Sequence, residues 1–192
     1  MLIAVLDADV LFPMVLRDTL LRAAAAGCFR LHWSSRIRDE VTRNLIDPYG
    51  MEGAKAIALR ALMEEAFPEA EVGGWEALEP TMRNHPKDRH VAAAAATIGA
   101  QIIVTSNIRD FADLPAGVEA MTPDRFLSAL LERAPEALIS ALRVQAAGYR
   151  RPPMSAADLV RQLAALAPTF SAAAARAIKG EGAPAVSARK TN

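Results

Sequence analysis

The sequence predicts an α/β fold with a central parallel β-sheet, followed by an all-helical extension. Residues 2–6 are apolar throughout and residues 101–105 (QIIVT) are rich in β-branched side chains, which is typical of strands buried on both faces of a parallel sheet. Helical patterns alternate with these strand-like segments, and such alternation indicates a three-layer α/β/α arrangement. After residue 122 the strand signal disappears and only helical patterns remain.

The expected elements of the first half begin and end at recognisable residues. Pro13 suits the first turn of a helix, Ser34 or Ser35 can cap the next helix, and Pro48 follows the end of that second helix. In chain order we expect strands at 2–6, 29–33, near Val72, 101–105 and 119–121, with helices at 13–26, 35–46, 51–66 and 86–98.

The second half is predicted to be a helical extension of residues 122–178. Helices are expected at 126–133, 136–147, 155–166 and 171–178, with a linker at 150–153. The tail, residues 179–192, is polar and contains Gly and Pro, so we expect it to be disordered. The domain division is therefore 1–121, 122–178 and 179–192.

Composition excludes several classes of protein. The formal net charge of the 192 residues is zero, so no global basic field indicates nucleic-acid binding, and any such contact must come from a local patch. A single cysteine, Cys28, excludes an internal disulfide and a cysteine-based zinc cluster. No signal peptide and no apolar run of about 18 residues is recognisable, so we expect a cytoplasmic protein without a membrane anchor.

Acidic and amide side chains follow two of the predicted strands. Asp7 and Asp9 come directly after the first strand, and Asn107 and Asp110 follow the strand at 101–105. In a parallel α/β sheet, ligands bind outside the carboxyl ends of the strands. We therefore expect these two loops to lie at the same edge.

Two further acids flank buried elements that reach the same edge. Glu40 lies on the helix after the second strand, and Asp88 lies near the start of the alanine-rich helix, where the helix dipole favours a negative charge. Clustered carboxylates repel one another and require a cation at neutral pH. Oxygen ligands without cysteine favour Mg²⁺ or Mn²⁺ over Zn²⁺.

Four stretches of the chain resemble, in order and spacing, the acidic motifs of PIN-domain ribonucleases, particularly the VapC-like toxins of type II toxin–antitoxin systems. They are VLDADVLF, WSSRIRDEVTRNL, HPKDRHVAAAA and IIVTSNIRDF. The resemblance covers about residues 1–121, and the helical half resembles the C-terminal extension of a subset of these toxins. It implies Mg²⁺- or Mn²⁺-dependent RNA hydrolysis that leaves 5′-phosphate and 3′-hydroxyl ends.

By position, the resemblance assigns site roles to five residues. It makes Asp7 the first metal ligand, Glu40 the second acid and Asp88 the third. Many relatives carry Asp where this chain has Asn107, and Asp110 stands three residues later. Catalytic roles are therefore expected for Asp7, Glu40, Asp88 and Asp110, and metal ligation for Asp7, Asp88, Asp110 and Asn107, with the fourth ligand open between the last two.

Other residues near the motifs are expected to support the site. Asp9 replaces the small polar residue usual in the family and either adds charge to the site or caps the helix that begins at Pro13. Thr105 and Ser106 can hold a ligand or a phosphate. Contacts with the RNA backbone are expected from Arg38, Arg43, Arg89 and Arg109, since phosphate contacts supply most of the affinity for nucleic acid.

The resemblance also implies partners. These are an RNA substrate and a cognate antitoxin protein, with a homodimer as a further option. The apolar positions of the helical half can pack on the first domain, form a dimer interface or receive an antitoxin helix.

Two alternative functions share part of this pattern. The string DADVL is similar to the nucleophile motif of haloacid-dehalogenase-like phosphatases, but Leu11 stands where that motif requires Thr or Val, and no downstream lysine and acidic motifs follow. Response-regulator receivers fail for a similar reason. The second alternative is a catalytically inactive PIN-like module for protein or RNA interaction, which the substitution at Asn107 favours.

Overall fold

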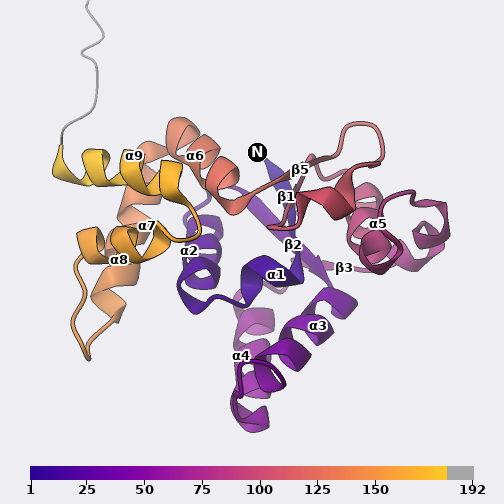
Figure 1. Ribbon diagram of the computed structural model, residues 1–192, viewed down its shortest axis with the longest axis horizontal. Helices are drawn as coiled ribbons and strands as arrows, with labels where there is room; N and C mark the ends of the chain where they lie inside the picture. The colour runs from indigo at the N-terminus through magenta and orange to yellow at the C-terminus, as the bar shows by residue number, and fades with distance from the viewer. Residues whose placement is uncertain (181–192) are drawn as a thin grey trace, which may run out of the picture.

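A computed structural model describes residues 1–180, and within that range the strands form a single five-stranded parallel sheet. The strands are β1 (Ile3–Leu6), β2 (Arg30–Ser34), β3 (Glu71–Val72), β4 (Ile102–Val104) and β5 (Glu119–Met121), in the spatial order β3-β2-β1-β4-β5 (Figure 1). The predicted α/β class and all five predicted strands are confirmed. Of the tail predicted to be disordered, residues 181–192 lie outside the described part of the chain.

The central position of β1 follows from its sequence. Its last three residues, Ala4, Val5 and Leu6, are fully buried, as is usual for a strand with a neighbour on each edge and helices on each face. Leu6 pairs in register with Val104 of β4, while Val5 pairs with His32 of β2. The next strand, β2, pairs along one edge of β1, and β4 later pairs along its other edge.

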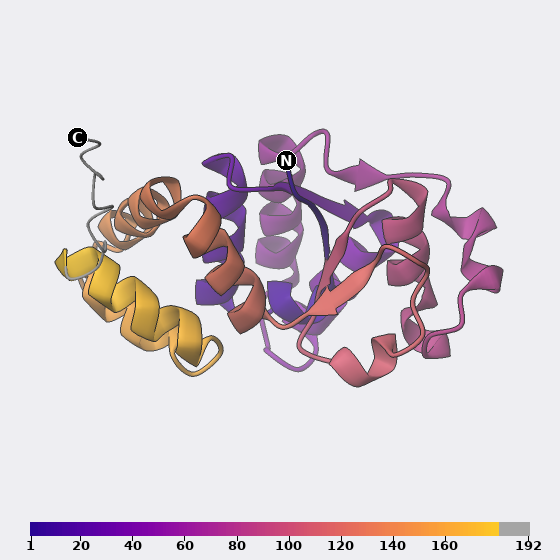
Figure 2. The same cartoon turned by 90° about the horizontal axis from the view of Figure 1, so that it is seen from above.

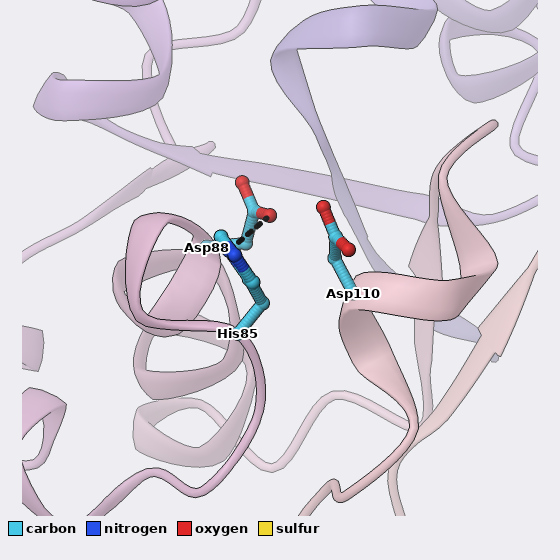
Figure 3. Close-up of side chains that lie close together, drawn as sticks. All are labelled: His85, Asp88 and Asp110. Atoms are coloured by element: carbon cyan, nitrogen blue, oxygen red, sulfur yellow. Dashed lines mark ion pairs between the residues drawn. The ribbon is translucent and has the colours of Figure 1, made fainter.

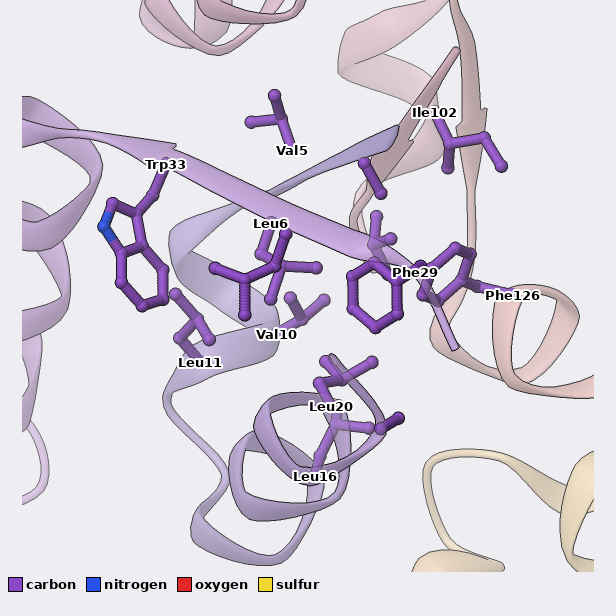
Figure 4. Close-up of a cluster of buried hydrophobic side chains, with 14 of the residues drawn as sticks. Val5, Leu6, Val10, Leu11, Leu16, Leu20, Phe29, Trp33, Ile102 and Phe126 are labelled. Atoms are coloured by element: carbon purple, nitrogen blue, oxygen red, sulfur yellow. The ribbon is translucent and has the colours of Figure 1, made fainter. Parts of the chain in front are cut away.

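Helices cover both faces of the sheet. Helices α1 (Ala8–Leu11), α2 (Met14–Ala25), α3 (Ser35–Ile46) and α4 (Gly53–Ala66) lie on one side, and α5 (Arg89–Thr97) lies on the other. Figure 4 shows Leu6 directed toward Leu16 and Leu20 of α2, while its neighbour Val5 points to the opposite side of the strand. The five consecutive buried residues from Val91 to Ala95 let α5 pack closely on the sheet.

The short helix α1 was not predicted. We expected one helix over 13–26, whereas Asp7 caps a four-residue helix and α2 then starts at Met14. Pro13 separates the two, because its ring cannot continue a helix that is already under way. Short 3-10 helices η1 (Trp75–Ala77), η2 (Glu79–Thr81), η3 (Pro86–Asp88) and η4 (Ile108–Phe111) fill the loops beside β3, α5 and β4.

The helical extension packs on α2. It contains α6 (Pro123–Arg133), α7 (Pro135–Gly148), α8 (Ala156–Leu163) and α9 (Pro168–Lys179), and lies at the opposite end of the molecule from α5 (Figure 2). Helix α9 begins earlier than the predicted residue 171, because Pro168 suits a first helical turn. The fourth helix of the extension is thus longer than its alanine-rich pattern alone suggested.

One hydrophobic core extends from the sheet into the extension. Phe126 of α6 packs edge-to-face on Phe29 with ring centroids 4.9 Å apart, and the buried Thr19 hydroxyl of α2 donates to Gln145 Oε1 of α7 over 2.8 Å. Most of the apolar side chains of the extension are thus buried within this one chain, although Leu166 is 41% exposed. The division at residue 121 stays a prediction, because this core crosses it.

None of the helices in residues 1–180 is long and apolar enough to cross a membrane.

Candidate functional site

The predicted site residues gather where the strand order reverses. Asp7 directly follows β1 and Thr105 directly follows β4, its neighbour in the sheet. The backbone N–H of Asp7 donates to the carbonyl oxygen of Val104 over 3.0 Å, so the two strand ends are held together. After β1 the chain continues to β2 on one side of the sheet, and after β4 it continues to β5 on the other side. Open α/β sheets bind ligands at such a switch point.

Asp7 is almost fully buried, with 6% of its surface exposed. One carboxylate oxygen accepts from the backbone N–H of Ala8 over 2.7 Å, and the other accepts from the Thr105 hydroxyl over 2.8 Å. Burial, followed by the charge of neighbouring Asp9, outweighs these hydrogen bonds and raises the pKa of Asp7 to about 7. A buried carboxylate of this kind is only partly ionised at neutral pH unless a cation compensates its charge.

Asp9 lies on α1 and points back toward the loop after β4. Its Oδ2 accepts from the backbone N–H of Ser106 over 2.8 Å, and the Thr105 hydroxyl lies 3.4 Å away. Burial raises its pKa, and its Oδ1 is buried without a hydrogen-bond partner among the described residues. The alternative in which Asp9 caps the following helix is wrong, since α2 has no side-chain cap.

Asp88 and Asp110 face each other at the same edge (Figure 3). Asp88 ends η3 and Asp110 lies in η4, and the backbone N–H of His85 donates to the Asp110 carbonyl oxygen over 2.9 Å. Burial, followed by the charge of Asp110, raises the pKa of Asp88. The Asp88 charge in turn contributes to the raised pKa values of Asp7 and Asp9, after burial, so the four aspartates form one electrostatic group.

Asn107 belongs to this group through hydrogen bonds. Its side-chain amide donates to the carboxylate of Asp110, and its backbone N–H donates to the Thr105 hydroxyl oxygen over 3.1 Å. The contact orients Asp110 toward Asp88.

Glu40 forms its contacts elsewhere. Its Oε1 lies 3.3 Å from Nε2 of the fully buried His90, and 3.8 Å from the guanidinium of Arg36 on the same helix. Burial opposes its ionisation, but the contact with His90 and the charges of Arg36 and Arg43 outweigh burial and lower the pKa of Glu40. Asp7, Asp9, Asp88 and Asp110 interact through their charges, whereas no hydrogen bond or ion pair among residues 1–180 joins Glu40 to these aspartates.

The four predicted RNA contacts have different environments. Arg43 and Arg109 are exposed, and Arg89 is half-buried with its Nε donating to the Asn84 carbonyl oxygen over 3.3 Å. Arg38 is 6% exposed and forms ion pairs with Glu64 and Glu71. This burial contradicts the predicted RNA contact of Arg38, which instead fastens α3 to α4 and β3.

Sequence reasoning gave His85 no functional role, yet its ring lies within the acidic group. Its Nδ1 is 3.8 Å from Oδ2 of Asp88, and one ligand atom each from His85, Asp88 and Asp110 lie within 4.8 Å of one another (Figure 3). The sequence did contain a signal for this position: His85 stands three residues before Asp88, and Pro86 between them begins a helical turn.

The geometry and chemistry of this group suit a divalent cation. Burial, followed by carboxylate repulsion at Asp7 and Asp88, raises the pKa of three of its carboxyl groups, and Asp9 Oδ1 and Asp88 Oδ2 are buried without hydrogen-bond partners among the described residues. A buried anionic oxygen without a donor is costly, and a hard cation is the partner that carboxylates accept most readily.

Comparison with known proteins agrees with this arrangement. A family model described as PIN domain matches residues 4–109, and a second, described as VapC50 C-terminal domain, matches residues 123–176. A protein of Mycobacterium tuberculosis named "Putative ribonuclease VapC50" is 37% identical over 106 residues, which are 54% of this chain and 63% of that relative. The chain therefore spans less than two thirds of the length of this relative. No solved structure was found to match.

The PIN-domain match covers more than half of the chain and includes both strand ends that build the site. The matched range includes Asp7, Glu40, Asp88 and Asn107, and it ends one position before Asp110. This protein therefore belongs to the PIN-domain family, and its C-terminal helices match the domain described for VapC50.

Proposed function

We propose that this protein is a metal-dependent endoribonuclease, and that it is the toxin of a toxin–antitoxin pair acting in the cytoplasm. The observation that carries the proposal is the group of four aspartates at the β1–β4 switch point. Three of them have raised pKa values, and two carry buried oxygens that have no hydrogen-bond partner within residues 1–180. Such a group is electrostatically incomplete without a cation. The PIN-domain family and the name of the relative support RNA as the substrate.

Asp7, Asp88 and Asp110 would hold Mg²⁺ or Mn²⁺. Thr105 holds the Asp7 carboxylate through its hydroxyl, and Asn107 orients Asp110, which makes Asp110 the stronger candidate for the fourth ligand. A bound divalent cation would polarise an RNA phosphodiester and lower the pKa of an attacking water.

The remaining predicted residues act around this centre. The backbone N–H of Ser106 holds Asp9 in place, and Asp9 would add negative charge to the site. Glu40, kept ionised by His90 and Arg36, would add a second negative charge near this centre. The exposed side chains of Arg43 and Arg109, together with Arg89, are proposed to contact the phosphate backbone of RNA.

The test is RNA cleavage by purified Asp88→Asn protein in Mn²⁺ and in Mg²⁺. We expect loss of cleavage, with 5′-phosphate ends produced only by the wild-type protein. Asp113→Asn is the matched control, because Asp113 is an exposed aspartate three residues beyond Asp110. Undiminished cleavage by Asp88→Asn would overturn the site assignment.

The inactive interaction module is separated from the enzyme by metal binding. Calorimetric titration of the wild-type protein with Mn²⁺ should show binding if the aspartate group is a working metal site, and no heat if catalysis has been lost.

A cognate antitoxin and a homodimer remain proposals from the family. Growth arrest on expression, relieved by co-expression of one specific partner, would support the first, and the mass of the purified protein in solution decides the second.

A further inference from the structure

His85 occupies a position that the all-oxygen site predicted from the sequence did not include. Its backbone N–H donates to the carbonyl oxygen of Asp110, and its own carbonyl oxygen accepts from the backbone N–H of Asp88, both over 2.9 Å. The following Pro86 restricts the backbone of His85 further. These contacts therefore fix the backbones of His85, Asp88 and Asp110 relative to one another.

The donor atoms have the spacing of ligands around one ion. The ring Nδ1 lies 3.8 Å from Asp88 Oδ2, and one ligand atom each from His85, Asp88 and Asp110 lie within 4.8 Å of one another. Ligands of a divalent ion sit at about 2.0–2.2 Å from it, so two ligands on one ion are separated by at most about 4.4 Å. Small side-chain rotations would bring the three ligand atoms within this limit.

The contact between His85 and Asp88 leaves both groups available. At 3.8 Å, the nitrogen and oxygen are too far apart for a hydrogen bond. Asp88 Oδ2 is buried and has no hydrogen-bond partner among the described residues, although the ring stands next to it. An ion between the two would satisfy the orphaned oxygen and give the ring nitrogen a partner at the same time.

Building on the proposed metal-dependent function, we propose that His85 is a nitrogen ligand of the cation held by Asp88 and Asp110, and that it gives the site a preference for Mn²⁺ over Mg²⁺. Mg²⁺ retains its water and binds through oxygen donors, whereas the first-row divalent metals, of which Mn²⁺ binds most weakly, also accept imidazole nitrogen. The affinity of Mn²⁺ for a site with one nitrogen donor should thus exceed its affinity for the same site without it, while Mg²⁺ gains little.

The experiment compares wild-type protein with His85→Ala and His85→Gln by calorimetric titration with Mn²⁺ alone and Mg²⁺ alone. We expect both variants to weaken Mn²⁺ binding about tenfold and to change Mg²⁺ binding by less than about threefold. The spin-echo spectrum of bound Mn²⁺ should show coupling to a directly bound ¹⁴N nucleus in the wild-type protein and lose it in both variants. The matched control is His32→Gln, since within the described residues His32 contacts the Ala70 carbonyl oxygen and forms no ion pair with an acid.

The outcomes separate this inference from the function on which it rests. If Mn²⁺ binds, Asp88→Asn abolishes binding, and the His85 variants keep both the affinity and the nitrogen coupling, His85 is not a ligand and the proposed function stands. If the wild-type protein binds neither metal, the proposed function itself fails. Because the His85 side chain is about half exposed, both variants should fold, and their circular dichroism spectra check this.

Discussion

Replacing Asp7 with asparagine should stabilise the metal-free protein at neutral pH. The Asp7 carboxyl is 6% exposed and its pKa is raised to about 7 by burial and by the charge of Asp9. The difference from the ordinary value of 3.8 corresponds to about 4 kcal/mol of unfolding free energy lost when the carboxyl ionises. Asparagine removes that cost but gives up one accepted hydrogen bond, worth about 1 kcal/mol. The expected net gain is about 3 kcal/mol.

The pH dependence follows from the sign of the pKa change. Because the folded state binds the Asp7 proton more tightly than the unfolded state, the folded state holds more protons between about pH 4 and pH 7. The stability of the wild-type protein relative to Asp7→Asn therefore falls as the pH rises through this window and levels off above it. Near pH 4 the carboxyl is protonated in the fold, and the variant should have no advantage.

Urea denaturation in the presence of EDTA, at several pH values from about 4 to 8, measures this difference. Asp113→Asn is the control, because Asp113 is exposed and its replacement should give no pH-dependent gain. Adding Mn²⁺ at the highest pH should stabilise the wild-type protein and leave Asp7→Asn nearly unchanged. A stability difference between wild type and Asp7→Asn that does not vary with pH would refute the conclusion that Asp7 is a buried acid with a raised pKa.

Three further predictions concern the surroundings of the site. Arg38→Ala should lower the free energy of unfolding by about 1–3 kcal/mol and leave RNA affinity unchanged, since its ion pairs are structural; a large loss of affinity in a filter-binding assay would contradict this. Thr105→Val removes a hydrogen bond that lowers the pKa of Asp7, so the acidic limb of the pH profile of kcat/KM should move to higher pH, and an unmoved limb counts against the contact. Phe126→Ala should cost about 3–5 kcal/mol in chemical denaturation, and a loss below about 1 kcal/mol would show that the extension is not part of the core.

The strands could be predicted from the sequence because their signals are local. Residues 2–6 and 101–105 show their burial directly in their composition, and the parallel arrangement follows from the helices between them. Helix α1 was missed because four residues are too few to show a periodic pattern. The start of α9 at Pro168 was missed for a different reason, since proline can begin a helix as well as precede one.

The acids of the site were predicted in part by the same local logic, because the ends of parallel strands meet at one edge. Asp7 and Asp110 lie where this rule puts them. The burial of Arg38 could not be predicted in the same way, because its partners Glu64 and Glu71 are 26 and 33 residues away in the chain. An arginine on a helix has the same local sequence pattern whether its side chain faces solvent or is buried in ion pairs.

The sequence by itself therefore determined the parallel sheet, the position of Asp7 after its first strand and the family to which the chain belongs. Only the tertiary structure decided the raised pKa of Asp7, the meeting of His85 with Asp88 and Asp110, and the separate environment of Glu40. The physical reason is that strand formation depends on neighbouring residues, whereas burial, charge coupling and ligand spacing depend on distant ones. The Thr105 hydroxyl that holds Asp7 is 98 positions away in the chain and 2.8 Å away in the fold.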